Sequence, residues 1–461
     1  MSTIEVVSLQ NKPQGWPGIT WIEGRTLLQV PNVKGQGEWR IGPAKKSDSP
    51  VFHNVAMANN RTRSVLLLGL AIRERWLLKE GKLRVLDGLA ASSLRSRRWL
   101  NELPEELVEK LEIISVDRNR ESVNWALANH KKYPPENSNH EQLSIQEGDL
   151  RQIVYSGGWQ WIDIDPYGSP IPFLDSAMQN LARKAILQVS ATDTAALCGT
   201  YPQVTRRRYA AYAVNDTVTH DTAIRILLGN IALCAAKHER SIEPLMSVFD
   251  GHHTRVSVLV TPGKKNASNV YENIGWRVNS PDKNTITTSI KAGLHSFGCA
   301  DYPQPRVFLP YNSPPKSLAN GKVSGPLWTG PIAKKQVLEH LTEDYALETC
   351  GICKDDHKHL ISLANWKDED IRMSNKKVIS CVKRLHQSKD AVETNGLVTM
   401  DELPQWINID GPPSPKKLIS AINQRGFKAA VSVISTPAIQ TDIPWNELIK
   451  IVKDINDVIA K

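Results

Sequence analysis

Residues 161–168, Trp-Ile-Asp-Ile-Asp-Pro-Tyr-Gly, have the types and order needed for chemistry on a flat base that carries an amine. The alternation of apolar and acidic side chains predicts a strand with Ile162 and Ile164 on one face. Pro166 cannot continue a strand and Gly168 tolerates a positive φ, so the chain must turn there. The acid, the proline carbonyl and the ring would then lie at a strand end, where they could bind an amine. In the alternative interpretation, the run is an ordinary Asp-Pro turn and its tyrosine only fills space.

Three more acidic residues, Asp87, Asp117 and Asp149, each follow an apolar run of the kind that forms strands. Small residues after Asp87 would let the backbone approach a ligand at the start of a helix, and this acid could meet a cationic amino-acid head. Asp117 could accept hydrogen bonds from the two hydroxyls of a ribose, and Asp149 could receive the amino group of adenine. The acids therefore predict an adenosine-containing cofactor. The chain has neither a Gly-rich phosphate loop nor a P-loop motif, which favours S-adenosylmethionine over NAD or ATP.

Strands and helices that alternate along the chain must position these residues. The sequence predicts strands at 83–86, 111–116, 143–146, 159–164, 185–191 and 255–261, and helices at 64–79, 93–100, 120–130, 172–183 and 221–238. Strands separated by helices are typical of a parallel, doubly wound α/β sheet of the Rossmann-like type. In such a sheet, ligands bind outside the carboxyl ends of the strands, which is where the acids are expected to lie.

The length of 461 residues predicts two or three domains. Residues 1–50 contain short apolar runs broken by Gly and Pro and are expected to be β-rich. Residues 51–261 hold the alternating elements and form the expected catalytic domain. Because composition changes near residue 262, residues 262–461 are expected to form a smaller α+β domain. Within it we expect loops and short strands at 262–330, helices at 335–347 and 416–425, and a strand at 427–434.

The chain carries 57 Lys and Arg against 48 Asp and Glu, which gives a net charge of +9 and a pI near 9.1. This excess of positive charge fits a polyanionic partner. The basic residues gather in several places: Arg95, Arg97 and Arg98; Arg206, Arg207 and Arg208; and the lysine pairs at 264–265, 334–335 and 376–377. Each cluster could also be a solvated face, which is the favoured interpretation for the lysine pairs.

Six cysteines are too few and too scattered for a disulfide framework, which predicts reduced thiols in a reducing compartment. Cys350 and Cys353, with His357 and His359, have a spacing that could bind a metal. A helix end with incidental thiols is the preferred interpretation, and no metal is predicted. No apolar run reaches the roughly 18 residues of a membrane span, and no signal peptide is visible. We therefore expect a cytoplasmic protein without a membrane partner.

At this point the sequence resembles a known family, the tRNA guanine-26 N2-dimethyltransferases of archaea, eukaryotes and a few bacteria. The resemblance rests on stretches that span nearly the whole chain: 51–54 through 60–61, 87–95, 165–170, 191–199, 220–228, 325–331, and 412–414 running to 441–445. The stretches around Asp165 and Asp193 are highly specific to this family.

The resemblance implies a class I S-adenosylmethionine-dependent methyltransferase domain and a C-terminal domain that binds tRNA. The cofactor pocket would be lined by Arg61, Asp87, Arg95, Asp117, Asp149 and Leu150. Asp165 would be the catalytic carboxylate, and the Pro166 carbonyl would accept from the amine beside it. Phe52 and Tyr167 would sandwich the target guanine, with Tyr167 standing where many relatives have Phe. Many relatives also carry two cysteine pairs that bind zinc, but only Cys299 lies in that stretch here, so that zinc site cannot be built.

Two other functions stay open at this stage. The first is an amino-methyltransferase that acts on DNA, protein or another nucleic acid, although such enzymes usually show an Asp/Asn-Pro-Pro-aromatic order that residues 165–168 lack. The second is a tRNA-binding or tRNA-folding protein that has lost catalysis, against which the intact Asp165, Arg61 and Asp117 argue. The sequence favours a monomer and leaves the number of methyl groups added undecided.

Overall fold

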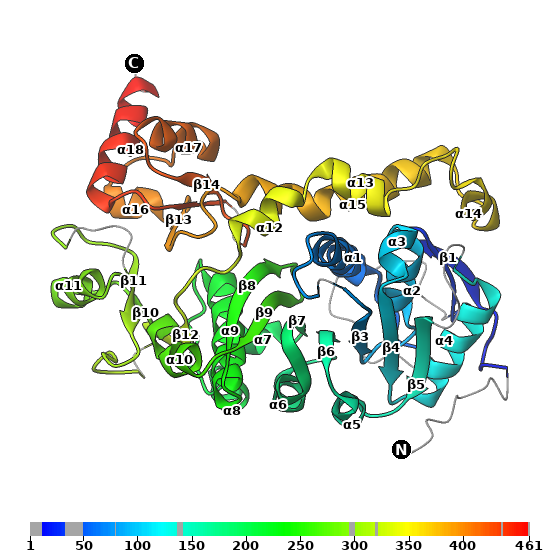
Figure 1. Cartoon of the computed structure of the whole chain (residues 1–461). Coiled ribbons are helices and arrows are strands. Elements are labelled where there is room, and N and C mark those ends of the chain that lie inside the picture. Colours follow the sequence, from blue (N-terminus) through cyan, green and yellow to red (C-terminus); the bar gives the residue numbers. More distant parts are fainter. Residues whose placement is uncertain are drawn as a thin grey trace. The chain divides into compact units, whose positions relative to one another are not determined.

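The computed structural model describes residues 12–32, 49–78, 80–135, 142–294, 300–318, 321–434 and 437–459. The chain forms two compact units that interleave in sequence (Figure 1). The first contains Met1–Pro166, Pro172–Ser190 and His340–Lys383, and the second contains Tyr167–Ile171, Ala191–Glu339 and Arg384–Lys461. The change in composition suggested a single boundary near residue 262, whereas these two units are each made of several separate segments. That boundary stays a prediction.

Parallel strands form the centre of the first unit. They are β3 (Leu83–Gly88), β4 (Leu111–Asp117), β5 (Leu143–Glu147), β6 (Trp159–Ile164) and β7 (Leu181–Ala191). Their order in the sheet is β5-β4-β3-β6-β7, and neighbouring strands pair in parallel. All five strands were predicted, from apolar runs and, for β6, from the alternation of apolar and acidic residues; most of their residues are buried, as in parallel strands covered on both faces.

Helices connect these strands. Helices α2 (Leu94–Glu102), α4 (Arg120–Lys132) and α6 (Ile171–Asn180) were predicted, although α6 ends at Asn180 rather than 183 because β7 begins at Leu181. The short helices α3 (Glu105–Val108) and α5 (Leu150–Ile153) were not predicted. The start of α4 follows from the Asn119 side chain, which accepts hydrogen bonds from the backbone N–H of Glu121 and Ser122. Asp149 caps α5 in the same way.

A helix was predicted at 64–79. Helix α1 (Ala58–Arg73) begins six residues earlier than predicted and also ends six residues earlier. Its first turns are polar yet buried: Asn60, Arg61, Thr62, Arg63 and Ser64 all lie inside the protein. Hydrophobic periodicity cannot detect a helix whose buried face is polar, so the start was predicted too late. Before it, β1 (Ile19–Glu23) and β2 (Thr26–Val30) form an antiparallel hairpin, as expected for the described part of residues 1–50.

The first unit also contains α13 (Glu343–Cys350), α14 (Lys358–Leu363) and most of α15 (Asp368–Ser388). The single helix predicted at 335–347 is instead two, α12 (Lys335–His340) and α13. The break follows from Thr342, whose side chain accepts from the Tyr345 N–H at 3.1 Å and starts a new helix. Tyr345 then donates to the Leu66 carbonyl at 2.9 Å, which fastens α13 to α1.

The second unit holds the other two strands of the seven-stranded sheet, β8 (Arg240–Phe249) and β9 (Thr254–Pro262), which pair antiparallel. Strand β9 was predicted, and β8 was not. Helix α9 (Thr219–Lys237) precedes them, close to the prediction. Short helices α7 (Thr194–Leu197) and α8 (Pro202–Tyr209) lie between β7 and α9, and α10 (Lys264–Ser268) follows β9.

Two three-stranded sheets complete the second unit. One has the order β11-β10-β12, from β10 (Ile274–Asn279), β11 (Arg306–Pro310) and β12 (Val323–Trp328), with α11 (Lys283–Lys291) in between. The other has the order β13-β15-β14, from β13 (Gly396–Thr399), β14 (Ala429–Val431) and β15 (Ala438–Thr441). It packs with α16 (Leu403–Ile407), α17 (Pro415–Gln424) and α18 (Trp445–Ile459) around one apolar core. The helix predicted at 416–425 is confirmed, but the strand predicted at 427–434 is only three residues long.

Among the described residues, the helices are all too short or too polar to cross a membrane.

Gly88, at the end of β3, tests how tightly the strand ends are packed. A Cβ at this position would lie 2.7 Å from Leu150 Cδ1 and 3.0 Å from the Asp163 carbonyl oxygen. Because Leu150 is itself buried and has little room to move, Gly88→Ala is expected to lower the free energy of unfolding by about 1–3 kcal/mol. Urea unfolding followed by tryptophan fluorescence measures this. Gly411→Ala, where a Cβ meets open space, is the control and should change little; equal stability of both variants would contradict the prediction.

Candidate active site

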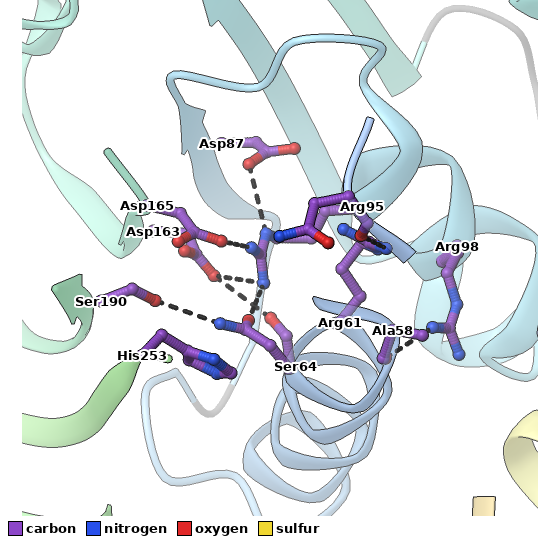
Figure 2. A network of polar contacts seen from close by, with 12 residues as sticks. Ala58, Arg61, Ser64, Asp87, Arg95, Arg98, Asp163, Asp165, Ser190 and His253 are labelled. Atoms are coloured by element: carbon purple, nitrogen blue, oxygen red, sulfur yellow. Dashed lines mark hydrogen bonds and ion pairs between the residues drawn. The ribbon is translucent and has the colours of Figure 1, made fainter. Parts of the chain in front are cut away.

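One arginine, Arg95, joins the acidic residues at the strand ends (Figure 2). Its Nη1 donates to Asn60 Oδ1 at 2.8 Å, and its Nη2 donates to the carboxylate of Asp165. Nη1 also lies 3.4 Å from Asp163 Oδ2, and Nε lies 3.6 Å from Asp87 Oδ1. Arg95, Asp87 and Asp163 are buried and Asp165 is partly exposed, so one buried guanidinium is shared among three carboxylates.

The sheet explains why these residues meet. Asp87 and Asp163 are partners in the parallel register of β3 and β6, and Asp165 is the first residue after β6. The loop from β3 to α2 then brings Arg95 back over the same edge. That loop is tight, with positive φ at Leu89, Ala91 and Ser93. The carboxyl ends of neighbouring strands and the start of the following helix therefore converge, as the Rossmann-like prediction required.

Burial changes the electrostatics of Asp87. Desolvation by burial is the main cause that raises its pKa, to about 7; the nearby carboxylates of Asp163 and Asp165 act in the same direction, while Arg95 and the Ser96 hydroxyl oppose them. The pKa of Arg95 is also raised, because the three acids outweigh the opposing effect of its burial. Asp87 is thus the member of the cluster that changes charge near neutral pH.

A second buried network lies alongside the first, between the hairpin, α1 and α2. Arg61 donates from Nε and Nη2 to the two carboxylate oxygens of Glu23, both at 2.5 Å, and from Nη2 to the Asn54 carbonyl at 2.9 Å. Arg98 donates to Glu23 at 3.0 Å and to Glu102 at 2.5 Å. Burial would raise the pKa of Glu23, but the two arginines lower it to about 2.

This finding corrects one expectation from the sequence. The run of Arg95, Arg97 and Arg98 was considered as a basic surface cluster, yet all three side chains are buried. Arg97 donates to the Tyr133 carbonyl at 3.0 Å, and burial lowers its pKa to about 10. These arginines therefore bind internal partners and do not form part of a polyanion-binding surface.

The residues expected to bind adenosine lie at the ends of β4 and β5. Asp117 accepts from the backbone N–H of Ala91 and of Asn119, both at 2.8 Å, and is half-buried. A carboxylate has lone pairs for about four hydrogen bonds, so Asp117 can still accept from two ribose hydroxyls. Asp149 accepts from Arg151, which lowers its pKa to about 2 and keeps it an acceptor. Leu150 is buried against Gly88. The acids and the apolar side chain present fit the adenosine part of S-adenosylmethionine.

The two aromatic side chains expected to bind the base are both exposed, Phe52 at 42% and Tyr167 at 66%. Gly168 has φ of 97°, which confirms the turn predicted after Pro166. Pro166 itself is buried. Phe52 belongs to the first unit and Tyr167 to the second, and their pairing around a guanine stays a prediction.

Sequence reasoning assigned no role to several members of the Arg95 network. Asn60 also donates to Ser190 Oγ at 3.1 Å, and Ser64 donates to Asp163 Oδ2 at 3.3 Å. Asp163 was visible as the second acid of the alternating strand, two residues before Asp165, and that signal could have identified it. Nothing in the sequence pattern distinguishes Asn60, Ser64 or Ser190 from ordinary polar residues.

The cysteines considered as metal ligands do not converge. Cys350 is buried and Cys353 is exposed, and the Nδ1 of His357 accepts from the Cys353 N–H at 3.0 Å. In the part of the chain that the structure describes, Cys350, Cys353, His357 and His359 form no group of possible metal ligands. Cys299 lies outside the described residues.

This chain is similar to known proteins over most of its length. The model of a family described as N2,N2-dimethylguanosine tRNA methyltransferase matches residues 31–453. The tRNA (guanine(26)-N(2))-dimethyltransferase of Methanosarcina acetivorans is 28% identical, over 95% of this chain and 99% of its own length. The enzyme of the same description from Methanothermobacter thermautotrophicus is 30% identical, over 72% of this chain and 79% of its own length.

A solved structure shares the fold. Trm1 from Pyrococcus horikoshii, in complex with S-adenosyl-L-methionine, superposes with a TM-score of 0.70 at 22% sequence identity, and the match covers 94% of this chain and 99% of that one. The predicted fold class is thereby confirmed: a doubly wound, Rossmann-like class I methyltransferase domain with a smaller α+β C-terminal domain.

The raised pKa of Asp87 predicts how stability depends on pH. An acid with a pKa of about 7 when folded and 3.8 ordinarily stabilises the fold fully below pH 3.8, and this contribution is lost as pH rises through about 7. Asp87→Asn removes the titration and keeps an acceptor for Ser96. We expect the Tm of the variant, relative to the unsubstituted protein, to be higher by about 2 °C or more at about pH 8.5 than at about pH 5. A Tm difference that is the same at both pH values would contradict the pKa shift.

Proposed function

This chain belongs to the N2,N2-dimethylguanosine tRNA methyltransferase family, and we propose that it transfers methyl groups from S-adenosylmethionine to the exocyclic N2 amine of guanosine 26 in tRNA. The observation that carries this proposal is the carboxylate of Asp165. It stands directly after β6, is bound by Arg95, and is followed two residues later by the exposed ring of Tyr167. An acceptor for an amine and a face for a base are thus separated in the chain only by Pro166.

The bound cofactor supplies an electrophilic methyl group on a sulfonium. The protein must supply orientation, because the lone pair of guanine N2 is delocalised into the ring and makes a poor nucleophile. Asp165 and the Pro166 carbonyl would accept from the N2 hydrogens and orient the nitrogen toward the methyl group that the cofactor would supply. Asp165 would take the proton that the amine loses when a bond to nitrogen replaces the bond between the methyl group and sulfur.

Arg95 is a positioning residue for this step. Its guanidinium contacts Asp165, Asp163 and Asp87 together, so Asp165 cannot rotate without disturbing the whole cluster. A catalytic group whose orientation is set before the substrate binds needs no reorganisation at the moment of reaction.

The target base must leave the RNA stack to reach this carboxylate, which costs a few kcal/mol. Exposed aromatic rings offset that cost by stacking on the extruded base. Phe52 and Tyr167 have the exposure that such a role needs.

Mass spectrometry of nucleosides from an unmodified tRNA transcript tests the proposal directly. After incubation with the protein and S-adenosylmethionine we expect dimethylguanosine, and we expect it to disappear when guanosine 26 is replaced. Bound but unmethylated tRNA would instead support a protein that has lost catalysis, and methylation of another position would support a different substrate.

Asp165→Ala separates catalysis from binding. Because the general base is removed, methyl transfer should fall by about 100-fold or more, while tRNA affinity stays within a few fold. Nucleoside mass spectrometry and filter binding measure the two quantities. Glu106→Ala, at an exposed acid of α3 outside the expected tRNA-binding domain, is the control and should leave both unchanged. Parallel loss of activity and tRNA binding would show that Asp165 is structural.

A further inference from the structure

We propose that the arginines of α8 form the surface that binds the RNA phosphates flanking the target base, and that Asp193 positions this surface. The inference rests on the proposed function and names which of the basic clusters meets the tRNA. All the contacts that support it lie within the second unit.

Helix α8 presents three consecutive arginines to solvent. Arg206, Arg207 and Arg208 are all exposed. Arg207 has neither an ion pair nor a hydrogen bond from its side chain within the described residues. Arg206 lies over the ring of Tyr212, with 5.1 Å between its Cζ and the ring centroid, which orients the guanidinium without neutralising it. Their planar, permanently charged heads suit bidentate contacts to phosphate oxygens.

An exposed aromatic residue stands at the start of the same helix. Tyr201 is the residue before Pro202, the first of α8, and is 58% exposed. Cationic side chains beside an exposed ring are typical of surfaces that bind single-stranded or extruded nucleotides, because the cations meet the backbone and the ring stacks on a base. A helix whose arginines were only solvated would need no exposed aromatic ring such as Tyr201 beside them.

Direct contacts tie α8 to the turn that carries Tyr167. The Gly168 N–H donates to Thr192 Oγ1 at 2.6 Å, and the Thr192 N–H donates to the Gly168 carbonyl at 3.0 Å. The next residue, Asp193, accepts from Arg208 Nη1 at 2.9 Å and from the Tyr209 hydroxyl at 2.5 Å. The helix with the arginines and the turn with the ring are therefore held by two adjacent residues, Thr192 and Asp193.

Most residues of the other basic clusters are buried or already paired with an acid. Arg95, Arg97 and Arg98 are buried. Three of the paired lysines already have acidic partners: Lys264 with Glu239 at 3.3 Å, Lys334 with Glu243 at 2.6 Å, and Lys335 with Asp390 at 2.8 Å. On α8, by contrast, Asp193 pairs with Arg208 alone and leaves two exposed cations for phosphate.

The test is the double variant Arg206→Glu with Arg207→Glu. Filter binding of a tRNA transcript, without cofactor and from roughly 50 to 300 mM KCl, gives the affinity and its salt dependence. We expect the Kd to rise about tenfold or more, and the slope of log K against log salt to fall by about 2, one unit for each lost phosphate contact. The Kd for S-adenosylmethionine and the Tm should not change, because both arginines are exposed.

Two matched variants make the result specific. Lys82→Glu with Lys110→Glu changes the charge equally at exposed positions just before β3 and β4, at the amino ends of the strands and outside the expected tRNA-binding domain, and should leave the salt slope unaltered. Arg206→Lys with Arg207→Lys keeps the charge and should retain the affinity within a few fold. The inference is overturned if the arginine-to-glutamate and lysine-to-glutamate variants behave alike. If tRNA binding is lost as expected but the unsubstituted protein makes no methylguanosine, the α8 surface stands and the proposed function falls.

The proposed role of Asp193 in positioning the α8 arginines can be tested separately, through the KM for tRNA. Asp193→Asn should raise the KM for tRNA several fold and leave the Kd for S-adenosylmethionine unchanged, because it loosens α8 without touching the Arg95 cluster. An unchanged KM for tRNA would show that Asp193 does not position the arginines.

Discussion

The contact of one buried guanidinium with three carboxylates is the constraint on which the site depends. Arg95 brings the buried Asp87 and Asp163 and the partly exposed Asp165 to a single point. Removing one partner of a buried ion pair typically costs about 3–5 kcal/mol, since the other charge is left uncompensated. The ends of β3 and β6 and the start of α2 therefore hold one arrangement, and Asp165 is held with them.

The second network makes that arrangement possible. Asn60 and Arg61 are neighbours at the start of α1, and Arg95 and Arg98 are one turn apart on α2. Asn60 contacts Arg95, while Arg61 and Arg98 share Glu23 from the hairpin. The two helices are thus joined by two parallel polar contacts, which orients Asn60 toward Arg95. Polar networks of this kind specify one packing where apolar contacts alone would allow several.

Features of the fold and the site that depend on neighbouring residues could be predicted from the sequence, whereas features that depend on residues far apart in the sequence could not. The strand at 159–164, the turn at Gly168 and the acids at the strand ends follow from local alternation and backbone preferences, and the structure places them as expected. The burial of Arg95 and Arg98 depends on Asp165 and Glu23, which lie 70 and 75 residues away in sequence. A run of arginines looks the same whether its partners are water or distant acids. The same limit applies to α1, whose buried face is polar and thus invisible to hydrophobic periodicity.

The distribution of charge separates the two kinds of ligand that the protein must distinguish. The strand ends of the first unit carry Asp87, Asp117, Asp149, Asp163 and Asp165, and the buried cluster among them has more acids than cations. That buried cluster favours a ligand that bears a positive sulfonium and ammonium over one that bears phosphate. Phosphate groups belong to the RNA, and the exposed arginines of α8 present the opposite charge. Because the catalytic carboxylate has the same sign of charge as the RNA backbone, the salt dependence of tRNA binding is expected to come from exposed cations such as these arginines and not from Asp165.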